Sequence, residues 1–79
     1  STHIHNWKVK LNKKYPGKYS LQKTLYDGHH SAYKYLCALP ANKVNNMILR
    51  NRLTKYYPYF SLIKTLYEAD IQAYKKLYR

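Results

Sequence analysis

Apolar and aromatic side chains recur every three or four residues along most of this chain. Near its start they form one helical stripe, which predicts a helix over residues 4–15. The stripe consists of Ile4, Trp7, Leu11 and Tyr15. A similar stripe predicts a helix over residues 43–57, which Asn42 can cap. No run alternates between apolar and polar residues in the way that indicates a β-strand.

Proline and serine divide the rest of the pattern. Pro16 and Pro58 end the first helices, because proline has no N–H to donate and clashes with the preceding turn. Ser20 and Ser61 follow, and serine often caps a new helix. The further helices are expected at residues 20–26 and 61–67 and, after breaks at 27–29 and 68–70, at residues 30–38 and 71–79. The prediction is therefore an all-α fold with about six short helices, in which the second and third of each half form a helix-turn-helix-like unit.

The chain repeats itself. Residues 20–26 return as residues 61–67, and 10 of the 17 positions from Ser20 to Leu36 are identical 41 residues later. Self-similarity at such a period is typical of repeated structural units. We therefore expect two tandem three-helix repeats, a first unit (residues 1–39) and a second unit (residues 40–79), packed together as one compact body.

The apolar positions recur in both units and are expected to form the core. These pairs are Trp7/Leu49, Leu11/Leu53, Tyr15/Tyr57, Leu21/Leu62, Leu25/Leu66, Tyr26/Tyr67, Tyr33/Tyr74 and Leu36/Leu77. Cys37 follows this pattern and is expected to be a small core residue. As the single cysteine it forms no internal disulfide, which favours an intracellular, reducing compartment.

Positive charge recurs as well. The 79 residues include 15 Lys and Arg against 3 Asp and Glu, a net charge of +12 that is shared equally by the two halves. Five cationic positions are matched between the units: Lys8/Arg50, Lys10/Arg52, Lys13/Lys55, Lys23/Lys64 and Lys34/Lys75. A core does not require matched surface cations, whereas a bound polyanion does.

The matched cations predict a nucleic-acid-binding module, with duplex DNA favoured over RNA and no small-molecule substrate. Basic side chains neutralise phosphates and release counterions, and the later helix of each helix-turn-helix-like unit would enter the major groove. The predicted nucleic-acid-binding residues are Lys8, Lys10, Lys13, Lys23, Lys34, Arg50, Arg52, Lys55, Lys64, Lys75 and Lys76.

Catalytic and metal-binding patterns are missing from the sequence. Asp27, Glu68 and Asp70 precede expected helices, where the helix dipole favours a negative charge. His29 and His30 are adjacent and so are not spaced to bind one metal ion. We therefore expect no enzyme activity, no cofactor and no metal site.

The repeated unit Ser-Leu-x-Lys-Thr-Leu-Tyr-x5-Ala-Tyr-Lys-x-Leu, within Tyr19–Leu36 and Phe60–Leu77, resembles the short tandem helical repeats appended to phage-type homing and HNH-like endonucleases. The resemblance implies a DNA-binding accessory segment of a longer protein. It does not imply nuclease activity, because neither a His-Asn-His nor a GIY-YIG constellation is present. A chain that begins at Ser1 is likewise expected to be processed or part of something longer.

Two other functions remain open. A cationic membrane-active peptide of the bacteriocin or toxin kind would be secreted and would bind a membrane surface. The mean hydropathy of −0.73 and the scattered lysines disfavour it, since interfacial helices need one large apolar face. A basic structural protein within a nucleoprotein assembly fits the same charge.

Overall fold

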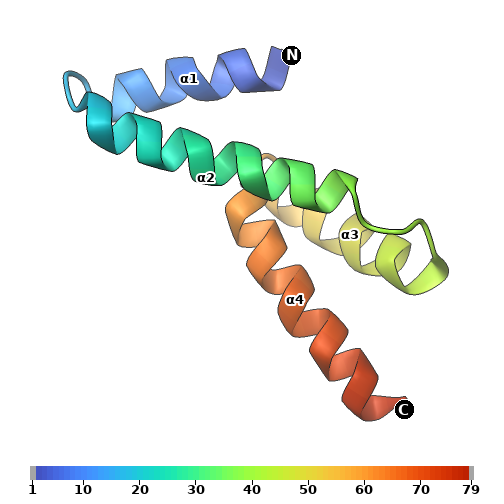
Figure 1. Ribbon diagram of the computed structural model, residues 1–79. Helices are drawn as coiled ribbons and strands as arrows, with labels where there is room; N and C mark the ends of the chain where they lie inside the picture. Colours follow the sequence, from blue (N-terminus) through green and yellow to red (C-terminus); the bar gives the residue numbers. More distant parts are fainter. Residues whose placement is uncertain (1, 79) are drawn as a thin grey trace.

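Four α-helices make up the described part of the chain. The computed structural model describes residues 2–78, with side chains from residue 6 onward, so the side chains of His3, Ile4 and His5 lie outside the described part. The helices are α1 (Thr2–Lys14), α2 (Tyr19–Cys37), α3 (Lys43–Tyr56) and α4 (Phe60–Leu77) (Figure 1). No strand occurs among these residues, so the prediction of an all-α fold is confirmed.

The prediction of six helices in two three-helix repeats is wrong, because each unit contains two helices. The second and third helices expected in each unit are one continuous helix, α2 in the first and α4 in the second. Gly28, expected to break the helix, lies inside α2 with an ordinary backbone conformation. Glycine in a helix interior costs only about 1 kcal/mol relative to alanine, and burial of His29 and Ala32 on the next turn outweighs that cost. The helix-turn-helix-like unit is therefore not formed by the residues described.

The helix starts differ from the expected ones. Ser20 and Ser61 lie in the first turns of α2 and α4, which begin after Lys18 and Tyr59 without a side-chain cap. Asn42 does cap α3, as the sequence predicts, because its side-chain oxygen accepts the N–H of Asn45 at 2.8 Å.

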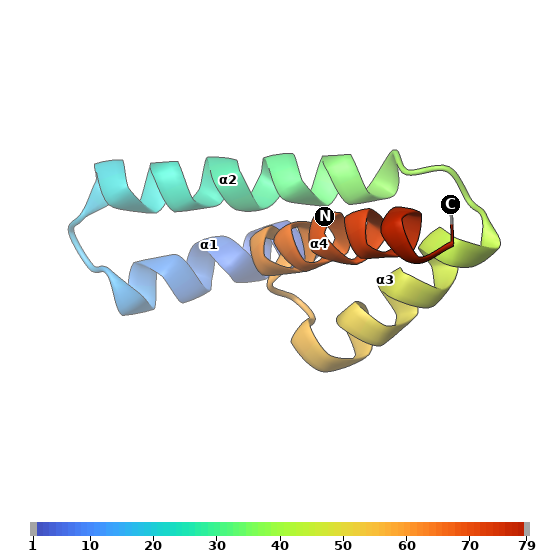
Figure 2. The same cartoon turned by 90° about the horizontal axis from the view of Figure 1, so that it is seen from below.

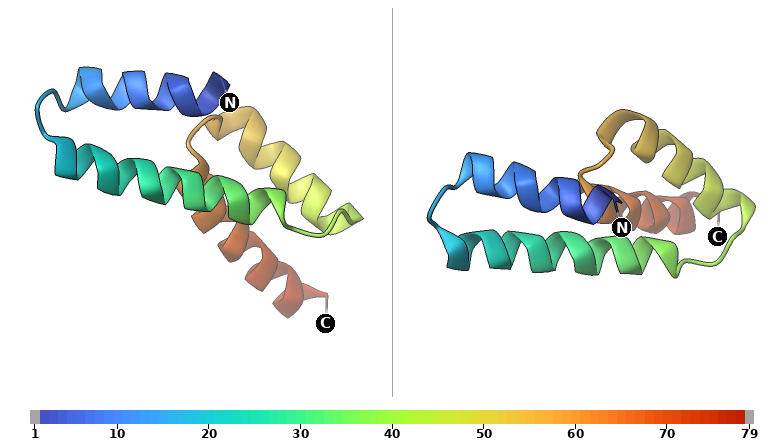
Figure 3. Two further views of the ribbon diagram at one scale, coloured as in Figure 1. Left: turned by 45° about the horizontal axis from the view of Figure 1, so that its top comes forward. Right: turned by 90° about the horizontal axis from the view of Figure 1, so that it is seen from above.

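Each unit is a pair of helices joined by a short turn. The first turn contains Gly17 at φ +77°, a left-handed conformation that glycine adopts without a steric cost. In the second unit, α4 packs against both α3 and α2 and lies between them (Figure 2). The molecule is elongated, 49 × 21 × 20 Å, with the α1–α2 turn at one end and the α2–α3 connector at the other (Figure 3).

The core lies where α2 crosses α4. Ala32 and Leu36 of α2 pack against Phe60, Ile63 and Tyr67 of α4, and Ile63 is completely buried. Removing these side chains from water is the main stabilising contribution at this crossing. The two units are therefore held together by an apolar interface.

A second cluster joins α1 to this core. The ring of Trp7 stacks on buried His29 with centroids 4.1 Å apart, and Tyr59 meets the Trp7 ring edge-on at 5.8 Å. His29 in turn lies 5.1 Å from Phe60, ring centroid to ring centroid. Leu11, one turn further along α1 than Trp7, is buried.

Several expected core residues are instead exposed. Leu21 and Leu25 are exposed because α4 begins opposite His29 and does not extend over these earlier turns of α2. Leu62, Tyr74 and Leu77 are exposed as well, and Tyr74 and Leu77 border an open groove between α3 and α4 near the end of α4.

The expectations for cysteine and for the remaining tyrosines are met only in part. Cys37 is exposed at the last residue of α2, so its assignment to the core is wrong. Tyr57 is exposed in the turn before α4. Tyr67 is buried, whereas Tyr15, Tyr26 and Tyr33 are half-buried.

Candidate nucleic-acid interface

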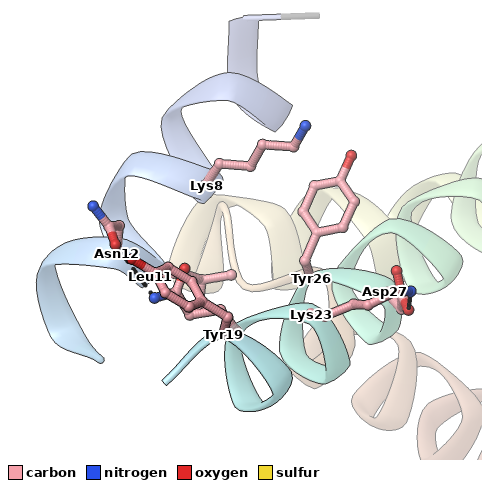
Figure 4. A pocket seen from close by; sticks show the side chains of 8 residues that line it. Lys8, Leu11, Asn12, Tyr19, Lys23, Tyr26 and Asp27 are labelled. Carbon is pink, nitrogen blue, oxygen red and sulfur yellow. Dashed lines mark hydrogen bonds and ion pairs between the residues drawn. The ribbon is translucent and has the colours of Figure 1, made fainter. Parts of the chain in front are cut away.

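Two predicted cations meet in a groove between α1 and α2. Lys8 extends over the ring of Tyr26, with Nζ 5.0 Å from the centroid, and Lys23 lies on the same side of α2 (Figure 4). Lys23 is paired with Asp27 at 2.7 Å, and this hydrogen bond raises the pKa of the Lys23 ammonium. Both partners are exposed, so an incoming phosphate can compete with Asp27 for Lys23.

Arg52 is held by a carboxylate on the neighbouring helix. Its Nε and Nη2 donate to the two oxygens of Asp70 at 2.8 and 2.9 Å, a bidentate arrangement. This hydrogen bonding lowers the pKa of Asp70. Arg52 therefore joins α3 to α4. Of the predicted binding residues, it is the one whose charge is most completely neutralised by an ion pair within the protein.

Three further predicted cations lie over aromatic rings. Lys10 Nζ is 5.2 Å from the Tyr59 centroid, Lys55 Nζ is 5.5 Å from the Tyr56 centroid, and Lys64 Nζ is 4.7 Å from the Tyr35 centroid. Such contacts orient an ammonium group without neutralising it. None of the three is paired with a carboxylate in the described part of the chain, so an anionic partner can contact them.

The remaining predicted cations are exposed on the outer sides of the helices. They are Lys13, Lys34, Arg50, Lys75 and Lys76. Lys13, Lys34 and Lys75 lie in the last turns of α1, α2 and α4, where the helix dipole favours a positive charge. Part of the matching between the units therefore has a structural cause that the sequence did not reveal.

The structure does not gather all of these residues on one face. On α1, Lys8 faces the groove shared with α2, whereas Lys10 lies toward the turn between α3 and α4. Three exposed lysines, Lys14, Lys18 and Lys43, were not predicted to bind, and none of them has a basic counterpart in the other unit. Counting exposed cations, rather than matched ones, would have found them.

No group of three or more His, Cys, Asp or Glu that could hold a metal ion occurs within the part of the chain that is described. His29 is buried against Trp7, and the ring of His30 stacks at 6.0 Å on Tyr26. None of the helices, as far as they are described, is both long and apolar enough to cross a bilayer.

Comparison with known proteins adds no relative: no family model matches the chain, and neither a curated protein nor a solved structure matches it significantly.

Proposed function

We propose that this chain binds nucleic acid, preferably duplex DNA, through contacts between its exposed basic side chains and the backbone phosphates. One observation carries the proposal. Of the 14 described Lys and Arg side chains, 12 are exposed, and two, Lys23 and Arg52, are held in ion pairs. The third carboxylate, Glu68, is itself exposed. Such an excess of solvated positive charge raises the local concentration of a polyanion and speeds its association.

Phosphate contacts fit this arrangement better than base reading. The cations lie on all four helices of an elongated body, and α2 and α4 each run without the break that would set a recognition helix apart. Phosphate contacts carry no sequence information by themselves. The expected activity is therefore charge-driven binding with little sequence preference. The resemblance of the repeated unit to DNA-binding accessory repeats supports the same proposal.

An intracellular, reducing location belongs to this proposal. Nucleic acid is the expected partner, and the free thiol of Cys37 is exposed, where an oxidising compartment would leave it open to intermolecular disulfides.

The test is fluorescence anisotropy of labelled duplex DNA titrated with the protein at several salt concentrations. The logarithm of the association constant should fall linearly with the logarithm of salt concentration, by about 0.9 for each phosphate neutralised. Single-stranded DNA and duplex RNA of the same length serve as parallel probes. A salt-independent affinity would reject the proposed contacts, and equal or tighter binding of RNA would reject the preference for DNA.

A further inference from the structure

Because the two units are repeats, the residues that pack between helices in one unit identify equivalent residues in the other unit that are left exposed. In the α2–α4 interface, α2 supplies His29, Ala32 and Leu36. The residues 41 positions later on α4 are Asp70, Ala73 and Leu77. They lie on the same side of α4 and line an open groove of about 590 Å³ between α3 and α4, where Leu77 is 73 % exposed. The end of α4 thus presents the surface that α2 uses for packing, and apart from the ion pair of Asp70 with Arg52 this surface is open.

The opposite end of the molecule has the complementary surface. On α4 the residues that receive α2 are Phe60, Ile63 and Tyr67, all buried. Their counterparts on α2 are Tyr19, Gln22 and Tyr26. These three line the open groove of about 640 Å³ between α1 and α2, and Tyr19 is 71 % exposed (Figure 4).

The occupied versions of both grooves show what would fill the empty ones. Phe60 lies 5.1 Å from the rings of both His29 and Tyr33, so the first unit receives the start of α4. The equivalent position in the second unit is bordered by Asp70 and Tyr74.

The other groove follows the same rule. Tyr33 and Leu36 of α2 pack in the core cluster that contains Phe60 and the half-buried Leu53 of the second unit. In the first unit, the equivalents of Leu53 and Phe60 are Leu11 and Tyr19, which line the groove that is open. The groove between α3 and α4 therefore lacks the start of a helix to fill it, and the groove between α1 and α2 lacks the end of a helix.

We propose that a second copy of this chain fills these grooves, head to tail. Ala73, Tyr74 and Leu77 of one molecule pack on Tyr19 and Gln22 of the next, which repeats the α2–α4 interface between molecules. The occupant is a second copy because the two unfilled surfaces of one chain are the two sides of an interface that the chain already forms internally. Such a contact joins different surfaces and so generates rows rather than closed dimers, as in stacked repeat proteins.

Charge makes this association dependent on salt. Each molecule carries +12, so two copies repel each other at low ionic strength. Within the chain, Lys64 lies over the ring of Tyr35. The equivalent residues between two molecules are Lys23 and Lys76, which repel each other, although the ion pair with Asp27 reduces the charge of Lys23. Salt screens this repulsion and leaves apolar packing intact. Self-association should therefore strengthen as salt rises, whereas nucleic-acid binding should weaken.

The test is sedimentation velocity of the full chain without nucleic acid, in about 0.5 M sodium chloride, where the screening length is roughly 4 Å. Wild-type protein should form dimers and longer rows as its concentration rises to about 1 mM. Leu77→Lys blocks the surface at the end of α4, which we call the tail. Tyr19→Lys blocks the surface at the start of α2, which we call the head. Each variant alone should remain monomeric, and an equimolar mixture of the two should form a dimer with one molecule of each.

Val9→Lys is the matched control, because Val9 is 46 % exposed, lines neither groove and receives the same charge change. It should assemble like the wild type, and circular dichroism should show unchanged helix content in all three variants. A wild type that stays monomeric over this range would overturn the proposal. So would a Tyr19→Lys variant that dimerises alone, since two tails would then pair with each other. These outcomes are independent of DNA binding, which the experiment does not use.

Discussion

The hydroxyl of Tyr67 on α4 donates a 2.7 Å hydrogen bond to the side-chain oxygen of Asn45 on α3, and both side chains are buried. The amide nitrogen of the same Asn45 donates to the carbonyl of Pro40 at 3.0 Å. Its backbone N–H is capped by Asn42. One asparagine therefore ties α4, the start of α3 and the connector between the units together.

Replacing Tyr67 with phenylalanine should destabilise the protein by about 1–3 kcal/mol, because the side-chain oxygen of Asn45 would stay buried without a donor. Burial raises the pKa of the Tyr67 hydroxyl, so it remains a donor throughout the neutral range. Urea unfolding followed by circular dichroism measures the change. Tyr26→Phe is the matched control, since Tyr26 is the half-buried counterpart in the first unit, and its effect should be within about 0.5 kcal/mol. Equal effects of the two changes would contradict the assigned role of Asn45.

The two glycines should respond in opposite directions to alanine. Gly28 lies inside α2, has an ordinary helical conformation and has open space where the alanine methyl group would lie, so Gly28→Ala should stabilise the protein by about 0.4–1 kcal/mol. Gly17 has φ +77°, so Gly17→Ala should destabilise it by about 1–2 kcal/mol despite equally open space. Thermal unfolding followed by the fluorescence of Trp7 reports both changes. Destabilisation by Gly28→Ala would show that α2 is not continuous in solution.

Helix periodicity and the cap at Asn42 made the all-α fold and the extent of α3 predictable from the sequence. The continuity of α2 was not predictable, because the local signals at Asp27 and Gly28 favour a turn and only burial of His29 and Ala32 against another helix overrides them. Tertiary packing of this kind has no local signature.

The exposed leucines have the same explanation. Leu36 and Leu77 are equivalent in sequence, yet Leu36 is buried and Leu77 is 73 % exposed. A repeat predicts which positions are alike, but not which of them has a neighbour to pack against. Among the cations, likewise, neither ion pair was predictable. The i,i+4 pair of Lys23 with Asp27 requires α2 to continue through the break expected at residues 27–29, and the pairing of Arg52 with Asp70 depends on how α3 lies against α4.

The ion pair between Asp70 and Arg52 should make stability depend on acid pH. Arg52 lowers the pKa of Asp70 in the folded protein below the ordinary value of 3.8. The pair therefore stabilises the fold fully above the unfolded pKa, and this stabilisation is lost as the pH falls through the lower, folded pKa. In urea unfolding between about pH 6 and pH 2, wild-type stability should fall more than that of Asp70→Asn.

Glu68→Gln is the control for the acid titration, because Glu68 is an exposed carboxylate of the same helix, and it should follow the wild-type profile. An Asp70→Asn variant that loses as much stability in acid as the wild type would mean that this carboxylate makes no pH-dependent contribution.

The proposed binding function makes a quantitative prediction for one matched pair of lysines. Lys34 and Lys75 occupy equivalent positions, are exposed and face no carboxylate in the described part of the chain. Changing both to glutamate reverses two charges without disturbing an ion pair. If each neutralises one phosphate, the affinity for duplex DNA at low salt should fall by more than tenfold, and the salt slope should decrease by about 1.8. Anisotropy titrations of the double variant measure both quantities.

Lys14 and Lys43 provide the comparison that separates position from net charge. Both are exposed, neither is matched by a cation in the other unit, and changing both to glutamate gives the same net charge as the Lys34/Lys75 variant. If the two units bind the duplex in equivalent ways, changing Lys34 and Lys75 should lower the affinity more than changing Lys14 and Lys43. The salt slope is the decisive measurement, because net charge alone changes the long-range attraction equally in both variants, whereas the number of released counterions depends on which lysines touch phosphates. Identical slopes for the two variants would remove the reason to regard the matched cations as a binding site, and the dipoles at the helix ends would then account for Lys34 and Lys75.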